Sequence, residues 1–275
     1  PPFARGAAPP RLGDEMFPAT SASCVTGLIV YDTFSQWTIF GQIVLIILIQ
    51  IGGMGFMTII SLAALATGRK IGLKERSVLS ESVNKPELGG IIRMVKKIAT
   101  GTFICEGIGA LLLSTRFIPK MGLLQGIGNS AFLAISAFCN AGFDLFGQFG
   151  AYSSLVPYVH NYYVQAVVMF MIIAGGLGFM VWVELIQYPK KRKLSLHARV
   201  VLIFSVLLWV GGAALIGLRE WNNPASMGGL SVSDKIMASL FQSVSTRTAG
   251  MNTIDLAACG PITKLLMSVL QFIGA

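Results

Sequence analysis

Three short glycine-bearing stretches hold the residues of this chain best suited to chemistry. They are SASCVTGL, SAFCNAGF and VSTRTAGM, residues 21–28, 136–143 and 244–251. They align on Gly27, Gly142 and Gly250, which are 115 and 108 residues apart. Glycine adopts backbone conformations that other residues resist, and it leaves a narrow passage free of side chains. Because rings of backbone carbonyls can replace the water shell of an ion, we expect the peptide units around these glycines to bind a dehydrated potassium or sodium ion.

The composition indicates that these stretches lie in a membrane. Of the 275 residues, 54% are hydrophobic and only 12% are charged, and the mean hydropathy is +0.71. A helix needs about 20 apolar residues to cross the hydrocarbon layer. The candidate spans are residues 40–66, 98–115, 162–187 and 200–218, with a partial fifth from residue 262. An enzyme is disfavoured, because the sequence shows no Ser/His/Asp set and no Cys or His spacing typical of a metal site.

The basic residues predict the orientation. Two connections, residues 68–97 and 189–199, contain 13 of the 21 Lys and Arg residues. By the positive-inside rule both connections face the cytoplasm. Residues 1–35, 116–161 and 219–261 are then expected outside, and the proline-rich residues 1–19 are interpreted as a solvent loop.

The outside segments contain short apolar stretches, residues 131–139 and 236–244, that are too short to span the membrane. Such pieces fit re-entrant segments, because irregular backbone at membrane depth is tolerated only where protein buries it or it lines water. A second repeated motif follows the first two glycine stretches, as GGMGFM at 52–57 and GGLGFM at 175–180. We expect these glycines to permit close helix packing, with a hinge as the alternative.

The chain is therefore predicted to contain copies of one unit, made of a helix, a re-entrant loop and a helix. The first copy lacks its leading helix. The predicted organisation is residues 1–67 for the first repeat, 68–97 for a basic cytoplasmic connection, 98–187 for the second repeat, 188–198 for another basic connection, and 199–275 for a third, shortened repeat.

The motifs VTGL, CNAGFD, TRTAGMNTID, LIQIGGMGFMTI and GRKIGLKER resemble the pore subunit of the Trk/Ktr/HKT superfamily of potassium transporters, and most closely its bacterial Ktr type. The resemblance covers nearly all of residues 15–275. It implies an all-α integral membrane protein with four repeats arranged like a potassium channel tetramer, of which three are partly present here. It also implies potassium uptake across the plasma membrane, a homodimer, and a cytoplasmic ring of regulatory subunits that bind the nucleotide.

The resemblance also implies roles for individual residues. The potassium filter is assigned to the backbone of Val25, Thr26, Gly27, Asn140, Ala141, Gly142, Thr248, Ala249 and Gly250. A serine at the first filter position goes with sodium preference in the superfamily, so Gly27 favours potassium. The third inner helix is expected to break into a gating loop at Gly274 and Ala275.

Several alternatives stay open at the level of sequence. The chain fits a sodium-conducting or sodium-coupled relative, and less well a secondary transporter with a midplane site made by broken helices. The two basic connections suit either the cytoplasmic regulator or anionic lipid headgroups. Nucleic acid is excluded as a partner, because the basic residues flank membrane helices.

Four charged residues lie close to these features. We expect Glu106 to form a hydrogen bond between helices, although an ionisable group at such depth is also a functional candidate. Glu184 is interpreted as an interfacial charge near the cytoplasm. Arg247 is expected to turn away from the ion and brace its loop through Asp255 or Asp144, with a barrier that tunes conduction as the alternative. Asp144 is predicted to brace the loop, to attract cations, or to do both.

Overall fold

The computed structural model describes residues 12–55, 58–59, 91–150 and 152–274, and every regular element within these ranges is a helix. The longer helices are α1 (Leu12–Ser23), α3 (Ile39–Met54), α6 (Ile91–Met121), α7 (Leu123–Phe138), α8 (Tyr162–Gly176), α9 (Phe179–Lys191), α10 (Leu196–Glu220), α11 (Val232–Ser245) and α12 (Pro261–Ile273). Helices of a single turn are α2 (Thr33–Gln36) and the 3-10 helices η2 (Phe146–Phe149) and η3 (Val156–Tyr158). Ala275 and most of the predicted connection 68–97 lie outside the described residues.

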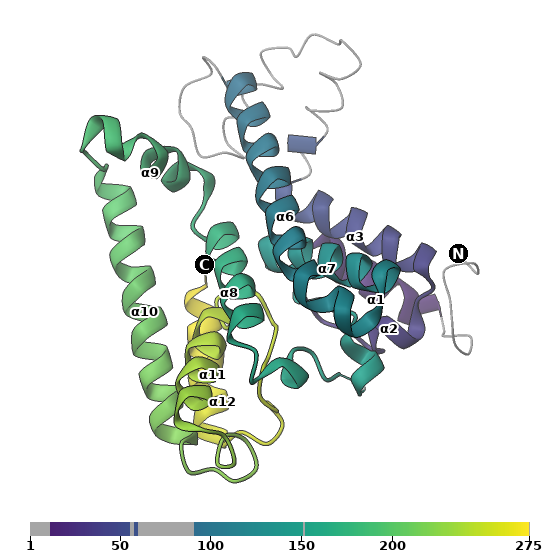
Figure 1. Cartoon of the computed structure of the whole chain (residues 1–275). Coiled ribbons are helices and arrows are strands. Elements are labelled where there is room, and N and C mark those ends of the chain that lie inside the picture. The colour runs from purple at the N-terminus through teal and green to yellow at the C-terminus, as the bar shows by residue number, and fades with distance from the viewer. Residues whose placement is uncertain (1–11, 56–57, 60–90, 151, 275) are drawn as a thin grey trace.

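In the described ranges, two helices are long and apolar enough to cross a membrane: α10, and α6 from Met94 onward. Below, α6 and α10 are called the outer helices. The shorter helices α3, α8 and α12, which follow the glycine stretches, are called the inner helices. Figure 1 shows α10 on one side of the molecule, α1 and α3 on the other, and α8 between them.

The candidate span over residues 162–187 is not one continuous helix, because α8 and α9 meet at an angle of 103°. The break falls at Leu177 and Gly178, and Gly178 has a φ of 80°. A right-handed helix cannot continue through a residue with that φ, and glycine is the residue that adopts it at least cost. The glycine-rich sequence GGLG therefore ends α8 where hydropathy alone predicts a continuous helix.

The prediction of a solvent loop over residues 1–19 is wrong for residues 12–19, which belong to α1. This helix contains Pro18 and packs against α3. Near its end, Ser21 and Ala22 are buried. The proline-rich composition predicted a loop, and the packing of the end of α1 against the apolar helix α3 offsets the cost of a proline inside a helix.

The two short apolar stretches predicted at 131–139 and 236–244 coincide with the second halves of α7, which ends at Phe138, and α11, and both helices begin earlier than expected. Helix α7 starts after Gly122, whose φ is 84°. Helix α11 starts after its N-cap Ser231, whose hydroxyl accepts a hydrogen bond from the Asp234 N–H at 3.2 Å. Each helix packs along an outer helix, α7 against α6 and α11 against α10. The hydropathy pattern predicted only the second half of each helix, which is buried.

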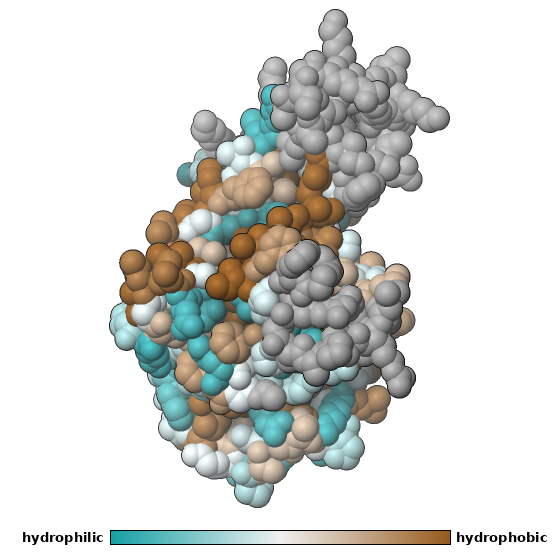
Figure 2. Space-filling view, turned by 90° about the vertical axis from the view of Figure 1, so that its right-hand side faces the viewer, coloured by the Kyte–Doolittle hydropathy of each residue, from teal (hydrophilic) through white to brown (hydrophobic). Residues whose placement is uncertain are grey.

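The core lies between α6, α7, α8 and α11, where apolar residues from all four helices are buried together. The outer surface is also apolar. Figure 2 shows hydrophobic side chains gathered in a band across one face, with hydrophilic residues gathered below it. On α10 the exposed apolar residues include Ile203, Phe204, Leu207 and Val210. Water would not favour such a surface, whereas lipid chains would cover it.

The turn between α9 and α10 is fixed by Glu184, which was predicted only as an interfacial charge. Its carboxylate accepts hydrogen bonds from the Ser195 N–H at 2.8 Å and from the Ser195 hydroxyl at 2.7 Å. Ser195 in turn caps the first turn of α10 through the Ala198 N–H. Glu184 therefore joins the start of an outer helix to the helix before it.

Candidate functional site

The three aligned glycines are 115 and 108 residues apart in the sequence and lie close together in the structure. We define the three glycine loops as residues 25–27, 140–142 and 248–250. A Cβ built on Gly27 would lie 3.3 Å from the Gly142 Cα, and one built on Gly142 would lie 3.4 Å from the Gly250 Cα. The second loop is therefore flanked by the first loop on one side and by the third loop on the other.

The helices of each repeat therefore bring together glycines that are far apart in the sequence. The three loops also share one backbone conformation, in which a left-handed residue comes two positions before a left-handed glycine. The φ angles are 56°, 55° and 73° at Val25, Asn140 and Thr248, and 72°, 72° and 76° at Gly27, Gly142 and Gly250. A left-handed conformation costs a residue other than glycine about 1–2 kcal/mol. Since the same cost recurs at three places, the surrounding structure must impose it.

Hydrogen bonds from each loop back to the preceding short helix impose this conformation. The N–H groups of Thr26, Ala141 and Ala249 donate to the carbonyls of Ser21, Ser136 and Ser245 at 2.9, 2.8 and 3.0 Å. A trans peptide unit directs its carbonyl opposite to its N–H. The carbonyls of Val25, Asn140 and Thr248 therefore point away from the helix ends.

The neighbouring carbonyls lie at the contacts between loops. The Ala141 oxygen would be 2.7 Å from a Cβ at Gly27, and the Ala249 oxygen would be 2.8 Å from a Cβ at Gly142. A side chain at either glycine would meet a carbonyl of the next loop. The glycines are thus required both by their φ angles and by the close approach of the loops.

Each glycine loop follows the C-terminal end of a short helix, α1, α7 or α11. The peptide dipoles of a helix give its C-terminal end a partial negative charge, equivalent to roughly half an elementary charge. Three such ends directly before the loops favour a cation over an anion at this place. The prediction that these residues come together is matched by the geometry, whereas their role as an ion filter stays a prediction.

The inner helices touch the backs of the loops through glycines that sequence reasoning assigned to close packing. A Cβ at Gly52 would lie 2.4 Å from the Ser23 carbonyl oxygen, and one at Gly53 would lie 2.4 Å from Cys139 Sγ. On α8, Gly175 lies against the Phe138 carbonyl in the same way. These positions admit no side chain, so the packing interpretation is confirmed for these glycines.

A different glycine ends each inner helix. Gly55 follows α3, Gly178 follows the end of α8, and Gly274 follows α12, with φ angles of 80°, 80° and 76°. Gly274, predicted as part of a gate, therefore lies at the C-terminal end of the third inner helix. Its predicted partner in the gate, Ala275, is outside the described residues.

Arg247 turns away from the loops, as expected, but the predicted partners Asp255 and Asp144 are wrong. Its Nη1 group donates to Ser205 Oγ on α10 at 2.7 Å, and its Nε group donates to the Gly274 carbonyl at 3.0 Å. The guanidinium also lies over the Trp209 ring, 5.6 Å from its centroid. Arg247 stands at the end of α11 and points back between the helices, whereas both carboxylates follow the loops on the other side.

Glu106 forms the predicted hydrogen bond between helices. This side chain on α6 is 4% exposed, and both of its oxygens accept from Gln50 Nε2 on α3, at 3.0 and 3.1 Å. Cys139, directly before the second loop, donates its S–H to the same carboxylate at 3.8 Å. Glu106 thereby joins an outer helix, an inner helix and the second glycine loop.

The segments after the glycine loops link adjacent repeats. The Tyr152 hydroxyl donates to the Val30 carbonyl at 3.0 Å, and the Leu155 N–H donates to the Asn252 carbonyl at 3.0 Å. Asp144 accepts from the Phe146 N–H at 3.1 Å, which supports the bracing role predicted for it. Burial raises the pKa of Asp144 above its ordinary value, because the charged form loses hydration.

Sequence reasoning missed the serines that hold the loops. The Ser21 hydroxyl lies 2.9 Å from Thr26 Oγ1, the Ser136 hydroxyl accepts from the Phe143 N–H at 3.0 Å, and the Ser245 hydroxyl donates to the Met251 carbonyl. The signal was present, since Ser21 and Ser136 begin two of the aligned stretches and Ser245 lies one position further on in the third.

Long apolar helices, with short helices that end in glycine loops between them, define an all-helical, multi-pass membrane protein. The chain belongs to the TrkH family of cation transport proteins, whose model matches residues 5–275. This finding confirms the predicted superfamily, which is one of transporters and not a class of enzymes.

Curated relatives agree with this family. The chain is 41% identical over 262 residues to the Ktr system potassium uptake protein B of Bacillus subtilis. It is 39% identical over 272 residues to the potassium/sodium uptake protein NtpJ of Enterococcus hirae, and 38% identical over 264 residues to the Ktr system potassium uptake protein B of Vibrio alginolyticus. The alignments cover 95%, 99% and 95% of this chain but only 58%, 59% and 57% of these relatives, so the chain spans less than two thirds of their length.

Proposed function

We propose that this chain forms most of a potassium uptake pathway and that the three glycine loops are its selectivity filter. The observation that carries the proposal is the shared conformation of the loops, with their N–H groups bonded to the helix ends and the carbonyls of Val25, Asn140 and Thr248 directed away from them. Carbonyl oxygens in this arrangement replace the hydration shell of a cation. The C-terminal ends of α1, α7 and α11 add a favourable potential for positive charge.

The arrangement of the loops supports a ring with a fourth member. Gly142 is flanked by two loops, whereas Gly27 and Gly250 each approach one loop among the described residues. A fourth glycine loop between the first and the third would complete a pseudo-fourfold filter. The repeats proposed at residues 1–67, 98–187 and 199–275 then each contribute one loop and one inner helix to a single pore.

We further propose that the loops open to the outside and that the basic connections 68–97 and 188–198 lie in the cytoplasm, as the positive-inside rule predicts. Gly274 then ends an inner helix below the filter, where the gate is expected. The homodimer and the nucleotide-binding regulatory ring follow from the resemblance seen in the sequence. Two of the relatives are named as proteins of a Ktr system, which fits a partner component.

Sodium is the second candidate ion. One relative is named as a potassium/sodium uptake protein. Gly27 favours potassium, since a serine at this position goes with sodium preference in the superfamily. A secondary transporter with a midplane site fits less well, because the glycine loops alternate with helices in one repeated order instead of an inverted one.

The test is expression of the full-length protein in a bacterium that lacks its own potassium uptake systems, with growth scored at low potassium. We expect growth to be restored and rubidium or potassium uptake to be measurable in the same cells. Failure of rescue together with sodium uptake would replace the potassium proposal by the sodium candidate.

The filter assignment has a separate test in the variant Gly142→Ser. A serine at this position must adopt a φ of 72° and place its Cβ 2.8 Å from the Ala249 oxygen. We expect weaker potassium affinity and reduced selectivity against sodium, both measured per molecule of protein that reaches the membrane. Unchanged affinity and selectivity would show that the second glycine loop does not contact the ion.

A further inference from the structure

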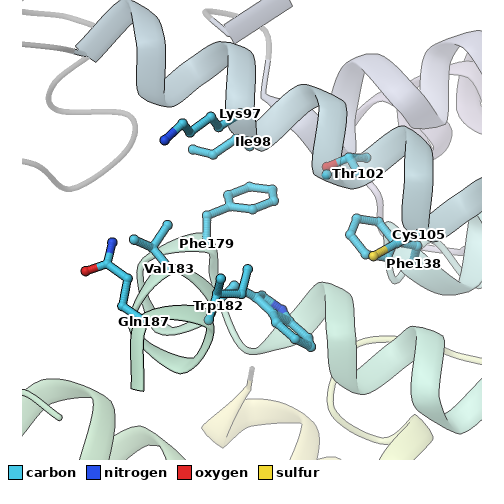
Figure 3. A pocket seen from close by; sticks show the side chains of 11 residues that line it. Lys97, Ile98, Thr102, Cys105, Phe138, Phe179, Trp182, Val183 and Gln187 are labelled. Atoms are coloured by element: carbon cyan, nitrogen blue, oxygen red, sulfur yellow. The ribbon is translucent and has the colours of Figure 1, made fainter. Parts of the chain in front are cut away.

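A narrow pocket lies between the first half of α6 and the helix α9, which leaves α8 at the 103° bend. Its volume is about 240 Å³. Helix α9 packs against α10, whereas α6 packs against α7 and α8, so the bend leaves the facing sides of α6 and α9 apart. Figure 3 shows side chains from both helices lining the space between them. The pocket is therefore a product of the glycine break that ends α8.

One face of each helix lines this pocket. Residues four positions apart lie on the same face of a helix, one above the other. Two such rows face each other across the pocket, made of Lys97, Gly101 and Cys105 on α6 and of Phe179, Val183 and Gln187 on α9. Between its two ends the pocket is apolar, so it does not offer water the hydrogen-bond partners that a buried water needs.

Trp182 is held in the wall of the pocket by a hydrogen bond. Its indole N–H donates to the Ala174 carbonyl at 2.7 Å. Ala174 belongs to the last turn of α8, where carbonyls lack partners inside the helix because the helix ends. The polar atom of the ring is thus bonded to α8, and the indole also lines the pocket. This part of the wall is apolar and fixed in position.

The pocket is polar at one end and apolar at the other. Figure 3 shows the ammonium of Lys97 and the amide of Gln187 at one end, with Cys105 and Phe138 at the other. Lys97 is exposed, and within the described part of the chain it forms no ion pair. Glu184, the acidic residue of α9, is bonded instead to the start of α10. The pocket therefore suits a ligand with a negative charge at one end and an apolar chain at the other.

The surroundings of the pocket suit lipid. Exposed apolar side chains flank it, among them Phe103 on α6 and Ile186 on α9. Lys97 lies in the first turn of the apolar stretch of α6 that begins at Met94, so its stem can cover apolar surface while its ammonium reaches the headgroups. By the positive-inside rule this end of α6 faces the cytoplasm, where the membrane carries anionic lipids.

We propose that this pocket holds one acyl chain of an anionic phospholipid from the cytoplasmic leaflet, with the lipid phosphate bound by Lys97. The ammonium has three donors, and its hydrogen bonds to a phosphate are strengthened by both charges. The pocket is smaller than the roughly 300–1,000 Å³ typical of small-molecule sites, which suits a single chain. A chain in this place gives the apolar walls the van der Waals contacts that an empty space would deny them.

This inference rests on the proposed orientation of the pore and connects the lipid to it. The apolar end of the pocket reaches Phe138, the last residue of α7, and the second glycine loop follows after Cys139. An acyl chain against Phe138 fills the space beside the helix end that holds this loop. The bound lipid therefore supports the second glycine loop from behind without contacting the ion.

The test uses the full-length protein in phosphatidylcholine vesicles, with phosphatidylglycerol as the anionic probe. Bromine atoms on the acyl chains of either lipid quench the fluorescence of a tryptophan that the chain touches. The difference between the wild type and Trp182→Phe isolates the signal of Trp182, which lines the pocket. We expect half of the maximal quenching at about a tenfold lower mole fraction of brominated phosphatidylglycerol than of brominated phosphatidylcholine.

Two variants with matched controls locate the lipid. Lys97→Ala should raise the half-saturating fraction of phosphatidylglycerol about tenfold, because a hydrogen bond to a charged group is lost. Lys96→Ala removes the same charge from an exposed residue outside the pocket lining and should have a smaller effect. Gly101→Leu should abolish the saturable quenching, because its side chain enters the pocket, where nothing lies within 4 Å of a built Cβ. Gly107→Leu, at an equally open position of α6 outside the pocket lining, should leave the quenching unchanged.

The lipid site is overturned by equal quenching with the two brominated lipids, by equal shifts for Lys97→Ala and Lys96→Ala, or by unchanged quenching in Gly101→Leu. Absence of quenching at Trp182 would mean that another part of the protein fills the pocket, and it would overturn the site as well. Potassium uptake by the same vesicles tests the proposed function separately, because lipid binding needs no ion gradient. Saturable binding of phosphatidylglycerol without uptake would support the lipid site and contradict the proposed potassium pathway.

Discussion

The conformation of single residues decides how close the glycine loops come together. In each loop, a residue with a side chain and a glycine both adopt left-handed backbone angles, separated by one residue. The hydrogen bonds to Ser21, Ser136 and Ser245 hold these angles, and the absence of a Cβ at the glycines lets the next loop approach. The close approach of the loops needs both the hydrogen bonds to the helix ends and the glycines, because a glycine without those hydrogen bonds would be free to adopt many conformations.

The middle loop should not tolerate an added methyl group. Gly142→Ala must hold alanine at a φ of 72° with its Cβ 2.8 Å from the Ala249 oxygen. We expect a loss of stability on the order of 2–3 kcal/mol from backbone strain and overpacking, and a matching loss of transport. Thermal inactivation in detergent and ion uptake in vesicles measure the two effects.

The matched control is Gly128→Ala in α7. Gly128 is exposed, is helical, and has nothing within 4 Å of a built Cβ. Alanine there should be neutral or stabilising, since alanine is the better helix former by about 1 kcal/mol. Equal effects of the two substitutions would contradict the close approach of the loops.

At the scale of helices, Glu220 joins the end of α10 to the start of α12. This carboxylate is 1% exposed and accepts from Asn223 Nδ2 at 2.6 Å, Ser226 Oγ at 2.5 Å and the Gly260 N–H at 3.0 Å. The Thr263 hydroxyl donates to it as well. A buried carboxylate surrounded by donors fixes the junction between α10 and α12, and among the described residues it forms no ion pair.

Replacing this carboxylate by an amide should loosen the junction. In Glu220→Gln, the NH₂ group faces groups that are themselves donors, so at least one buried donor is left unsatisfied. We expect a destabilisation on the order of 3 kcal/mol, seen as faster thermal inactivation. The control is Asp255→Asn in the nearby exposed turn, where the amide oxygen can still accept from the Ala257 N–H. Similar inactivation rates for the two variants would rule out this role of Glu220.

A second junction, between α8 and α11, depends on Asp234. Its carboxylate accepts from the Tyr162 hydroxyl at 2.7 Å and the Ser231 hydroxyl at 2.7 Å, and it lies 2.8 Å from His160 Nδ1. These hydrogen bonds, with that of Tyr162 first, hold the pKa of Asp234 at about 2, below its ordinary value of 3.8. The charged carboxylate is thus favoured in the folded protein.

The lowered pKa predicts how the stability depends on pH. A depressed folded-state pKa contributes stability above pH 3.8 that is lost as the pH falls toward 2. We therefore expect the wild type to be more stable than Asp234→Asn at neutral pH, with the difference shrinking below about pH 4. Thermal inactivation between pH 7 and the lowest tolerated pH tests this; a difference that grows on acidification would contradict it.

On the scale of the whole molecule, the sequence predicted the repeated glycine stretches and most helices, because repeated short motifs and runs of apolar residues can be recognised in the sequence itself. It could not predict α1, since Pro18 suggested a loop and only packing against α3 stabilises the helix. It also missed the partners of Arg247, because Ser205 and Gly274 are brought to it by the packing of α10 and α12. Hydropathy likewise could not predict the end of α8, because the left-handed backbone angle of Gly178 leaves no trace in the number of apolar residues.

The exposed apolar face of α10 provides a test of the membrane setting. Leu207 is 60% exposed near the middle of this helix. Leu207→Arg should cost about 3 kcal/mol on insertion and reduce the amount of protein in the membrane, because the charge would face lipid. Leu207→Ala should insert nearly normally. Equal insertion of the arginine and alanine variants would place this face against protein or water.

The order in which the glycine loops touch has a consequence for synthesis of the chain. The first loop contacts the second, and the second contacts the third, so neighbours in space are neighbours in the sequence. Each repeat leaving the ribosome therefore finds its docking surface already made by the repeat before it. Assembly can proceed stepwise as translation advances, and in the proposed ring the contact between the first and last loops is a long-range step that must await the end of the polypeptide.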